Sequence, residues 1–240
     1  MPEKTGIIIQ ARMSSARLPG KSLMMIGNHP LIWYVLKRAE ATGLPVVVAT
    51  STDYSDDSLC DYLRKEKIPF FRGYLQNVLN RYIKCAEKFG FEKIVRVTGD
   101  NPLFDFEFLQ KNINLFNSYN YVDGIYEGGL IKGAGFELVK LKELKKIPFS
   151  KKEHLEHVTL YLREHLADSE DRIQISPNEI NFFREEIILT CDYHSDFVLL
   201  NEIFRNFSYR PDILLPEIIY FLDQNPYLKK LNKNRDGSGG

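Results

Sequence analysis

Short runs of apolar, often β-branched residues alternate with longer amphipathic stretches along the first half of the chain. Runs that are apolar at successive positions are typical of strands buried on both faces of a sheet. Amphipathic stretches of about a dozen residues that end near glycine are typical of helices. The pattern predicts strands at residues 6–11, 45–51, 68–73 and 92–100, and helices at residues 30–43, 55–67, 76–90 and 104–116.

The second half of the chain is less regular. Its patterns predict two strands around a glycine-rich stretch, then a helix, and finally a strand that leads into a further helix, at residues 121–126, 135–141, 152–166, 186–192 and 193–204. Strands that alternate with helices indicate an α/β fold with a mostly parallel sheet and helices on both faces. We expect a single domain over residues 1–229, with a small insertion at 120–185 that forms an acceptor subregion, and a flexible tail at 230–240.

The charge balance and the cysteine content narrow the class of partner. The chain has 32 Lys and Arg residues against 32 Asp and Glu residues, so its overall charge gives no general attraction to nucleic acid or to an anionic membrane. No apolar run approaches the roughly 18 residues that span a bilayer. Three widely spaced cysteines, Cys60, Cys85 and Cys191, fit a reducing compartment. We therefore expect a cytoplasmic protein that binds small molecules.

Polar and charged residues follow three of the predicted strands. Ligands of open α/β sheets bind beyond the carboxyl ends of the strands, so these residues are candidates for a site. They are Arg12, Arg17, Gly20 and Lys21 after the first strand, Thr98 and Asp100 at the end of the fourth, and Asp192 at the end of the late strand.

Two carboxylates that meet beside a basic loop suit chemistry on phosphates. Asp100 and Asp192 can hold Mg²⁺, which takes its other ligands from water and substrate phosphates, while the loop neutralises a polyphosphate. Each motif also has a structural interpretation, since Asp100 can belong to a turn and Asp192 can cap a helix. Gly20, Lys21 and Ser22 match the end of a Walker A loop, but Ser15 stands where that loop has its first glycine.

A resemblance to a known family decides between these interpretations. The segment IIIQARMSSARLPGKSL resembles the N-terminal signature of cytidylyltransferases that activate acidic sugars, in particular the SpsF-like branch of spore coat polysaccharide synthesis. That branch is related to the acylneuraminate and 3-deoxy-manno-octulosonate cytidylyltransferases. Further similar segments follow in the order of the family, and the likeness covers most of residues 5–205: ATSTDYSDD, FFRGYLQNVLNRY, RVTGDNPLFD, EHVTLYL and LTCDYHSDF.

The resemblance implies an activity and a set of residues. The implied fold is a Rossmann-like nucleotidyltransferase sandwich, and the implied reaction is Mg²⁺-dependent transfer of CMP from CTP to a hydroxyl of an acidic sugar. Pyrophosphate is released, the product serves surface polysaccharide synthesis, and the enzyme is a homodimer. The implied catalytic residues are Lys21, Arg12, Asp100 and Asp192, the last two as metal ligands; the nucleotide-binding residues are Gln10, Ala11, Arg12, Arg17, Gly20, Lys21, Arg72 and Thr98; the acceptor-binding residues are Glu137, His157 and Asp196.

The chain departs from the pattern of this family at three places. Ser14 replaces a glycine of the first loop, and Asn77 replaces an aspartate before Val78 and Leu79. The late motif usually reads D-x-P-E-D, whereas here it reads DYHSD from residue 192. These changes keep the implied metal ligands and bear on the acceptor.

Two alternative functions remain open at the level of sequence. A glycosyltransferase of a related fold usually carries an Asp-x-Asp motif, and neither Asp100 nor Asp192 has an aspartate two residues further on. A non-catalytic nucleotide-binding subunit would bind nucleotide without releasing pyrophosphate.

Overall fold

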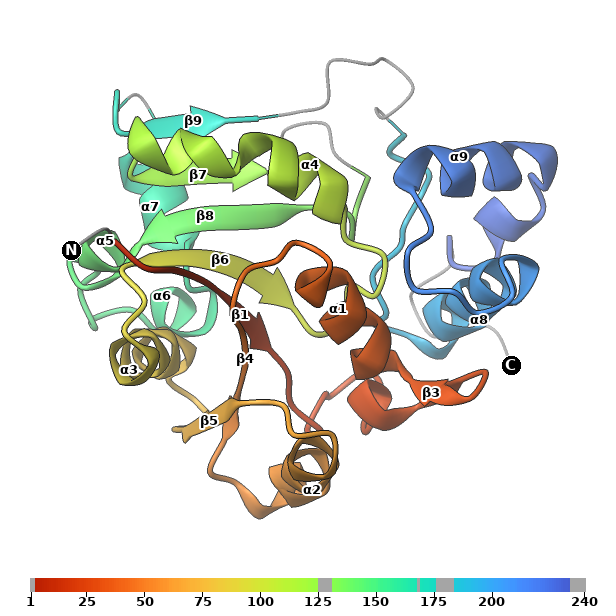
Figure 1. Ribbon diagram of the computed structural model, residues 1–240, viewed down its shortest axis with the longest axis horizontal. Helices are drawn as coiled ribbons and strands as arrows, with labels where there is room; N and C mark the ends of the chain where they lie inside the picture. Colours follow the sequence, from red (N-terminus) through yellow and green to blue (C-terminus); the bar gives the residue numbers. More distant parts are fainter. Residues whose placement is uncertain (1–2, 125–130, 168, 176–183, 234–240) are drawn as a thin grey trace.

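A mostly parallel sheet forms the centre of the computed structural model, which describes residues 3–124, 131–167, 169–175 and 184–233 (Figure 1). The strand order is β5-β4-β1-β6-β8-β7-β9. Only β8 runs antiparallel to its neighbours in this sheet, so the predicted mostly parallel sheet is confirmed. The strands are β1 (Thr5–Gln10), β4 (Val46–Ser51), β5 (Phe70–Gly73), β6 (Lys93–Thr98), β7 (Tyr121–Gly124), β8 (Phe136–Lys140) and β9 (Arg172–Gln174); a separate hairpin pairs β2 (Met25–Ile26) with β3 (His29–Pro30).

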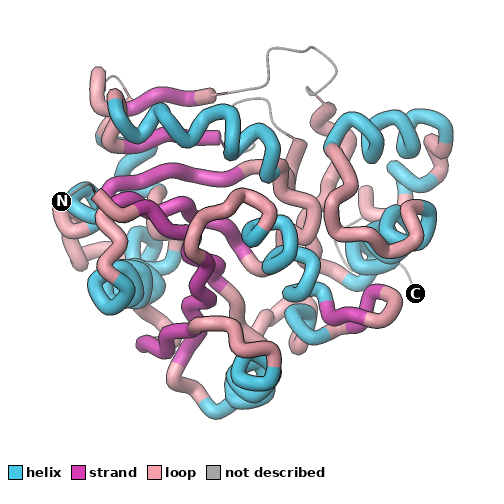
Figure 2. Tube along the Cα trace, in the orientation of Figure 1, coloured by secondary structure: helices cyan, strands magenta, loops and turns pink. Residues whose placement is uncertain are grey.

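Helices cover both faces of this sheet, which is why its strands are apolar at successive positions. Ile7 and Ile9 of β1 point into one apolar cluster and Ile8 points into the other. Figure 2 shows the strands enclosed by helices. The first cluster includes residues of α1 (Leu31–Glu40), α2 (Asp57–Lys65), α4 (Phe106–Asn112), α8 (His194–Asn206) and α9 (Leu215–Gln224); the second includes residues of α3 (Val78–Phe89), α5 (Leu141–Leu144), α6 (Lys152–Glu156) and α7 (Leu160–His165).

Short 3₁₀ turns join several of these elements: η1 (Lys21–Leu23), η2 (Tyr54–Asp56), η3 (Ile113–Asn117) and η6 (Leu228–Lys230). The strands of the predicted insertion, β7, β8 and β9, extend the central sheet. Residues 125–130 and 234–240 lie outside the described part of the chain, so the end of the predicted strand 121–126, the start of the glycine-rich stretch and most of the predicted tail are not described. None of the helices among the described residues combines the length and apolar composition needed to cross a bilayer.

The prediction of one continuous helix at 152–166 was wrong. It is divided into α6 and α7, and His157 between them has a non-helical backbone with φ −99° and ψ 82°. Val158 and Thr159 are buried at this break, and Thr159 donates a side-chain hydrogen bond to Glu137 of β8. Tertiary contacts of two β-branched residues therefore override the helical pattern.

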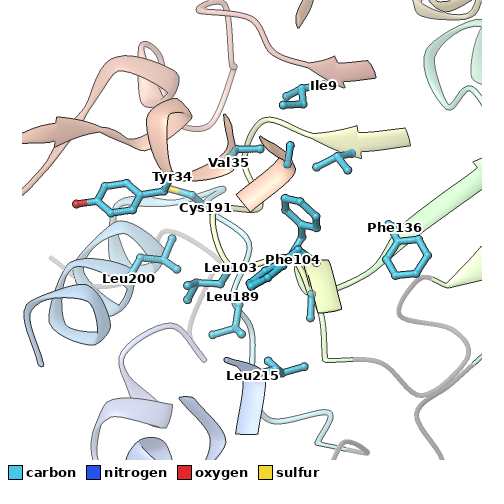
Figure 3. Packing of buried hydrophobic residues seen from close by; sticks show 14 of the residues in the cluster. Ile9, Tyr34, Val35, Leu103, Phe104, Phe136, Leu189, Cys191, Leu200 and Leu215 are labelled. Carbon is cyan, nitrogen blue, oxygen red and sulfur yellow. The ribbon is translucent and has the colours of Figure 1, made fainter. Parts of the chain in front are cut away.

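The predicted strand at 186–192 is an extended segment without a strand ladder. Ile188 forms an isolated parallel bridge with Lys132, and the Cys191 amide donates to the Asp100 carbonyl at 2.8 Å. Both partners lie in loops, so no continuous ladder forms. Leu189 and Cys191 point into the first apolar cluster (Figure 3), and Asp192 follows at the edge of a cleft.

Candidate active site

A cleft of about 230 Å³ opens beyond the carboxyl ends of β1 and β6. Gln10 and Thr98 are paired in register at the ends of these strands, and the Gly99 amide donates to the Gln10 carbonyl at 2.7 Å. The cleft therefore lies where open α/β sheets bind ligands. It is lined by Gln10, Ala11, Arg12, Ser15, Arg17, Lys21, Ser22, Arg96, Thr98, Gly99, Asp100, Glu156, His157 and Asp192.

The loop between β1 and η1 forms one wall of the cleft. The Gly20 amide donates to the Met13 carbonyl at 2.8 Å, so the loop folds back on its own start. Gly20 has φ +77°, a left-handed conformation that favours glycine, and the chain then enters η1 with Lys21 as its first residue. The hydroxyl of Ser22 donates to the Arg12 carbonyl at 3.3 Å. This local geometry directs Lys21 into the cleft.

Asp56 anchors the start of this loop from outside the cleft. Its buried carboxylate accepts the Met13 amide at 2.7 Å through Oδ1. Its Oδ2 accepts the Thr50 hydroxyl at 3.0 Å and both the amide and the hydroxyl of Ser51. In the sequence Asp56 belongs only to the predicted helix at 55–67, whereas the structure shows a carboxylate that joins the end of β4 to the loop.

Lys21, Asp100 and Asp192 meet in the cleft, although they are far apart in the sequence. Lys21 Nζ lies 2.7 Å from Asp100 Oδ2, 3.1 Å from Asp192 Oδ1 and 2.7 Å from the Cys191 carbonyl oxygen. Arg17 Nη2 lies 2.8 Å from the same Asp192 oxygen, and its guanidinium lies over the Tyr193 ring at 5.3 Å. The structure thus brings the two predicted metal ligands together around the predicted lysine.

The charges of this cluster support one another. Burial alone would lower the pKa of Lys21, but Asp100 and Asp192 raise it above its ordinary value. Burial alone would raise the pKa of Asp100, but the charge of Lys21 and its hydrogen bond hold it below the ordinary value. Opposite charges at this distance in a partly buried cleft favour the charged form of each partner. Lys21 and Asp100 are therefore both ionised at neutral pH.

A second buried ion pair lies behind the cleft. Arg96 of β6 lines the cleft and pairs with Glu137, which stands opposite it on β8. Glu137 is fully buried and also accepts the Tyr121 hydroxyl at 2.6 Å. The structure therefore places Glu137, predicted to bind the acceptor, behind Arg96 and out of the cleft, where it orients a guanidinium that does reach the cleft.

Asp196 and Arg72 also lie outside the cleft lining. Asp196 is fully buried; one of its oxygens accepts the amides of Asp192 and Tyr193 at 2.9 Å, and the other accepts Asn232 Nδ2 at 2.9 Å. It caps α8 and orients Asp192, so its predicted contact with an acceptor is replaced by a supporting role. Arg72 donates to the carbonyls of Ser51 and Asp53 and pairs with Asp57, which braces the turn after β4.

The remaining predicted residues line the cleft. These are Gln10, Ala11, Arg12, Thr98 and His157, in addition to the cluster around Lys21, and Gly20 precedes that lysine in the loop. Sequence reasoning missed Ser15, Ser22, Arg96, Gly99 and Glu156. Arg96 could have been found as a charged residue inside the apolar strand 92–100. The signal for Glu156 was weak, because its carboxylate comes within 4.0 Å of Arg12 only through the break after α6.

With this geometry in view, the chain can be compared with known proteins. The sequence pattern that defines the cytidylyltransferases matches residues 6–230. The chain belongs to the cytidylyltransferase family. It is therefore a nucleotidyltransferase, and the predicted enzyme class is confirmed. Membership in this family favours a cytidylyltransferase over the two alternatives, a glycosyltransferase and a non-catalytic nucleotide-binding subunit.

Similar cytidylyltransferases and their relatives match over nearly their whole lengths. The spore coat polysaccharide biosynthesis protein SpsF of Bacillus subtilis (strain 168) is 32% identical over 229 residues, which cover 91% of this chain and 94% of SpsF. A cytidylyltransferase structure from Leptospira borgpetersenii serovar Hardjo-bovis has a TM-score of 0.87 at 26% identity and covers 94% of this chain and 96% of that one. A structure of CMP:2-keto-3-deoxy-manno-octonic acid synthetase complexed with CTP shares the fold, with a TM-score of 0.62 at 16% identity, covering 85% of this chain and 100% of that chain.

The positions where this cytidylyltransferase departs from the family pattern lie outside the charged cluster around Lys21. Asn77 still caps α3, because its side-chain oxygen accepts the Asn80 amide at 2.8 Å. Ser14 is exposed, and His194 is exposed in the first turn of α8. The aspartates on either side of His194 keep the contacts described above. None of these departures removes a residue of the charged cluster formed by Lys21, Arg17, Asp100 and Asp192.

The chemistry of the donor set fits a divalent metal ion. Asp100 and Asp192 each direct one oxygen at the Lys21 ammonium, so two hard oxygen ligands converge on a point occupied by a cationic group. Among the described residues, no group of three or more His, Cys, Asp or Glu side chains is arranged to hold a metal. Two protein ligands suit Mg²⁺, which keeps waters and takes phosphate oxygens as its other ligands.

Proposed function

We propose that this cytidylyltransferase transfers CMP from CTP to a hydroxyl group of an acidic sugar and releases pyrophosphate, with Mg²⁺ held by Asp100 and Asp192. The observation that carries the proposal is the contact of Lys21 with both carboxylates in a cleft that also holds Arg12 and Arg17. The similarity to SpsF supports a sugar acceptor and a role in surface polysaccharide synthesis.

In this proposal the basic loop binds and orients the nucleotide. Arg12, Arg17 and Lys21 line one cleft and contact the phosphates, which offsets their negative charge and fixes the direction of the α-phosphorus. A bound Mg²⁺ would polarise the phosphate oxygens and stabilise charge that develops on them. The sugar oxygen forms a bond to the α-phosphorus while the bond from that phosphorus to the pyrophosphate oxygen breaks. The hydroxyl proton passes to solvent, and the electron pair of the broken bond leaves with pyrophosphate.

The acceptor is placed by the part of the cleft that does not belong to the basic loop. His157 and Glu156 approach from the end of α6, and Arg96 approaches from β6. Burial would lower the pKa of Arg96, but Glu137 raises it overall and keeps the guanidinium charged. A charged guanidinium is suited to the carboxylate of an acidic sugar.

Thermal unfolding tests the identity of the nucleotide before any acceptor is chosen. The protein is melted with Mg²⁺ and CTP, UTP, GTP or ATP in separate samples. A ligand at 100 times its Kd adds about 2.7 kcal/mol to the stability of the folded state, which corresponds to roughly 5–10 °C for a chain of this length. A rise with CTP is expected; a rise with another nucleotide alone would reassign the donor, and no rise with any nucleotide would contradict the proposal.

Turnover of a variant tests the site. Asp100→Asn removes a charge that contacts Lys21, and we expect pyrophosphate release from CTP and acidic sugars to fall about 100-fold or more, as for other lost electrostatic groups in active sites. Asp212→Asn is the matched control, because Asp212 is exposed and lies 3.6 Å from Arg210 away from the cleft. Full activity of the Asp100 variant, with unchanged circular dichroism, would contradict the proposed site.

A further inference from the structure

The ammonium of Lys21 occupies the point where the two carboxylates converge. Its three contacts, at 2.7, 2.7 and 3.1 Å, use all three hydrogens of an ammonium group. Its side chain is only 10% exposed, so water is a poor substitute for these partners. A cation that took both carboxylates would compete directly with Lys21.

The cleft is electrically balanced before any ligand enters. The positive charges of Lys21 and Arg17 pair with the negative charges of Asp100 and Asp192, so the two carboxylates already have positive partners. A divalent ion that bound alone and took Asp100 Oδ2 and Asp192 Oδ1 would displace Lys21 from both carboxylates and leave its buried ammonium with the Cys191 carbonyl. A buried charge that loses its counter-charge is strongly unfavourable.

A polyphosphate changes this balance, because it offers Lys21 a new anionic partner in the same cleft. From this geometry we propose that Lys21 is a resident counter-ion of Asp100 and Asp192, which makes the binding of a divalent metal and of a nucleotide polyphosphate mutually dependent. Lys21 moves from the carboxylates to the phosphates, and the carboxylates become available to the metal. This inference rests on the proposed function, and the coupling is reciprocal by thermodynamic linkage.

Lys21 carries this role rather than Arg17 for two reasons. The Arg17 side chain is 54% exposed and contacts only Asp192 of the pair, so it can return to solvent when that contact is lost. The Lys21 side chain is buried and contacts both carboxylates. A compact ammonium on a flexible stem can also exchange partners over a short distance without moving the backbone.

Binding of Mn²⁺ to the protein without nucleotide tests the inference. Free Mn²⁺ is followed by electron paramagnetic resonance in titrations of the wild type, Lys21→Met and Lys37→Met. We expect Lys21→Met to bind Mn²⁺ at least about tenfold more tightly than the wild type, equal to about 1.4 kcal/mol. Lys37→Met is the matched control, since Lys37 pairs with Glu40 on the surface of α1, and it should bind as the wild type does.

Further variants keep the test decisive. Lys21→Gln removes the charge but keeps a hydrogen-bond donor, and it should also bind Mn²⁺ more tightly than the wild type. It takes the place of Lys21→Met in the test if that variant fails to fold. Adding Asp100→Asn to either variant should abolish the gain, because it removes one of the two freed carboxylates. Equal or weaker Mn²⁺ binding by a folded Lys21 variant would overturn the inference.

The coupling itself is measured on the wild type. CTP should increase its affinity for Mn²⁺ at the protein, after correction for the metal that CTP binds in solution, and this increase should be smaller in Lys21→Met. A wild type that binds CTP but shows the same coupling as the variant would overturn the inference and leave the proposed function intact. If the wild type bound no nucleotide in the presence of metal, the proposed function would be contradicted. The titrations with Mn²⁺ alone would still test whether Lys21 competes with the metal for the two carboxylates.

Discussion

Asp56 shows how a residue outside the cleft determines the position of residues within it. Its carboxylate joins the Met13 amide to the end of β4 through Thr50 and Ser51. Met13 also accepts the Gly20 amide, so the same short segment holds the other end of the loop. The position of Lys21 thus depends on a carboxylate that has no contact with the cleft.

We expect Asp56→Asn to weaken both stability and nucleotide binding. The side chain of asparagine has one acceptor oxygen, whereas the carboxylate of Asp56 has two, so at least one of the buried donors around it would lose its partner. A buried donor left without a partner costs about 1–3 kcal/mol. The loop would be held less firmly, so the KM for CTP should rise more than kcat falls. Urea unfolding and steady-state kinetics measure the two effects.

Asp61→Asn in α2, the helix that begins directly after Asp56, is the matched control. Its side chain is 74% exposed and pairs with Arg64, so the free energy of unfolding should change by at most about 1 kcal/mol. An Asp56 variant with an unchanged KM for CTP would show that this carboxylate supports the fold alone.

At the level of elements, a tight turn aligns the segment that carries Asp192. Gly133 has φ +91°, and a Cβ at this position would lie 2.3 Å from the Thr190 amide nitrogen and 2.5 Å from the Leu189 carbonyl carbon. The turn therefore lies directly against the extended segment that the Lys132–Ile188 bridge holds. Only a residue without a side chain allows this approach of two backbones.

Gly133→Ala is expected to destabilise the protein and to weaken nucleotide binding together. Both backbones would have to shift, and Asp192 would shift with its segment. Gly43→Ala is the control, because Gly43 also has a positive φ of +77° but no atom lies within 4 Å of an added Cβ. It therefore measures the cost of backbone strain without the clash. We expect about 1 kcal/mol for the Gly43 control and a larger loss for Gly133→Ala, measured by thermal unfolding with and without CTP. Equal losses in the two variants would contradict this account.

At the scale of the whole molecule, buried ion pairs join neighbouring strands in the part of the sheet from β6 to β9. Glu137 of β8 pairs with Arg96 of β6, and Asp123 of β7 pairs with Arg172 of β9 at 2.9 Å. Burial alone would raise the pKa of Glu137, but the charge of Arg96 and the hydrogen bonds from Thr159 and Tyr121 hold it below the ordinary value.

This pKa predicts a direction for the effect of pH on stability. Since the folded pKa of Glu137 lies below the unfolded value of about 4.3, its contribution is present above that pH and is lost as the pH falls through the folded value. Glu137→Gln should lower the free energy of unfolding at pH 7 by about 3 kcal/mol, as for broken buried ion pairs. Its stability should also fall less steeply than that of the wild type below about pH 4.3.

Chemical unfolding of both proteins from pH 2 to pH 7 measures this difference. Glu40→Gln is the control, because Glu40 is 38% exposed and pairs with Lys37 on the surface, and it should change stability by at most about 1 kcal/mol. Identical pH profiles for the wild type and Glu137→Gln would contradict the assigned charge of Glu137.

Much of the fold could be predicted from the sequence because the signals are local. Each predicted strand and helix in the first 116 residues corresponds to an element near the predicted position. The strands β1 and β4 are apolar at successive positions because both faces of the sheet are covered. The helix at 152–166 could not be predicted correctly, since its break depends on Thr159 reaching Glu137 on a distant strand.

The candidate site was predictable where residues follow strand ends, and less so elsewhere. The rule that ligands bind beyond the carboxyl ends of strands brought Arg12, Lys21, Asp100 and Asp192 together correctly. The roles of Glu137 and Asp196 depended on which way each side chain points, and the structure buries both behind the cleft. The role of Asp56 gave no signal, because Thr50 and Ser51 lie near it in the sequence but the Met13 amide of the loop reaches it only after folding.

The sequence by itself determined the α/β class, the main strands and helices of the first 116 residues, and the types of charged residue delivered to one edge of the sheet. These depend on short-range hydrophobic patterns and on residues next to strand ends. Only the tertiary structure decided that one ammonium contacts two carboxylates separated by 92 positions (192 − 100), and that buried carboxylates support the loop and the metal ligand from behind. The reason is physical: periodicity records which face of an element is buried, whereas the partner of a buried charge is determined by segments that become neighbours only when the chain folds.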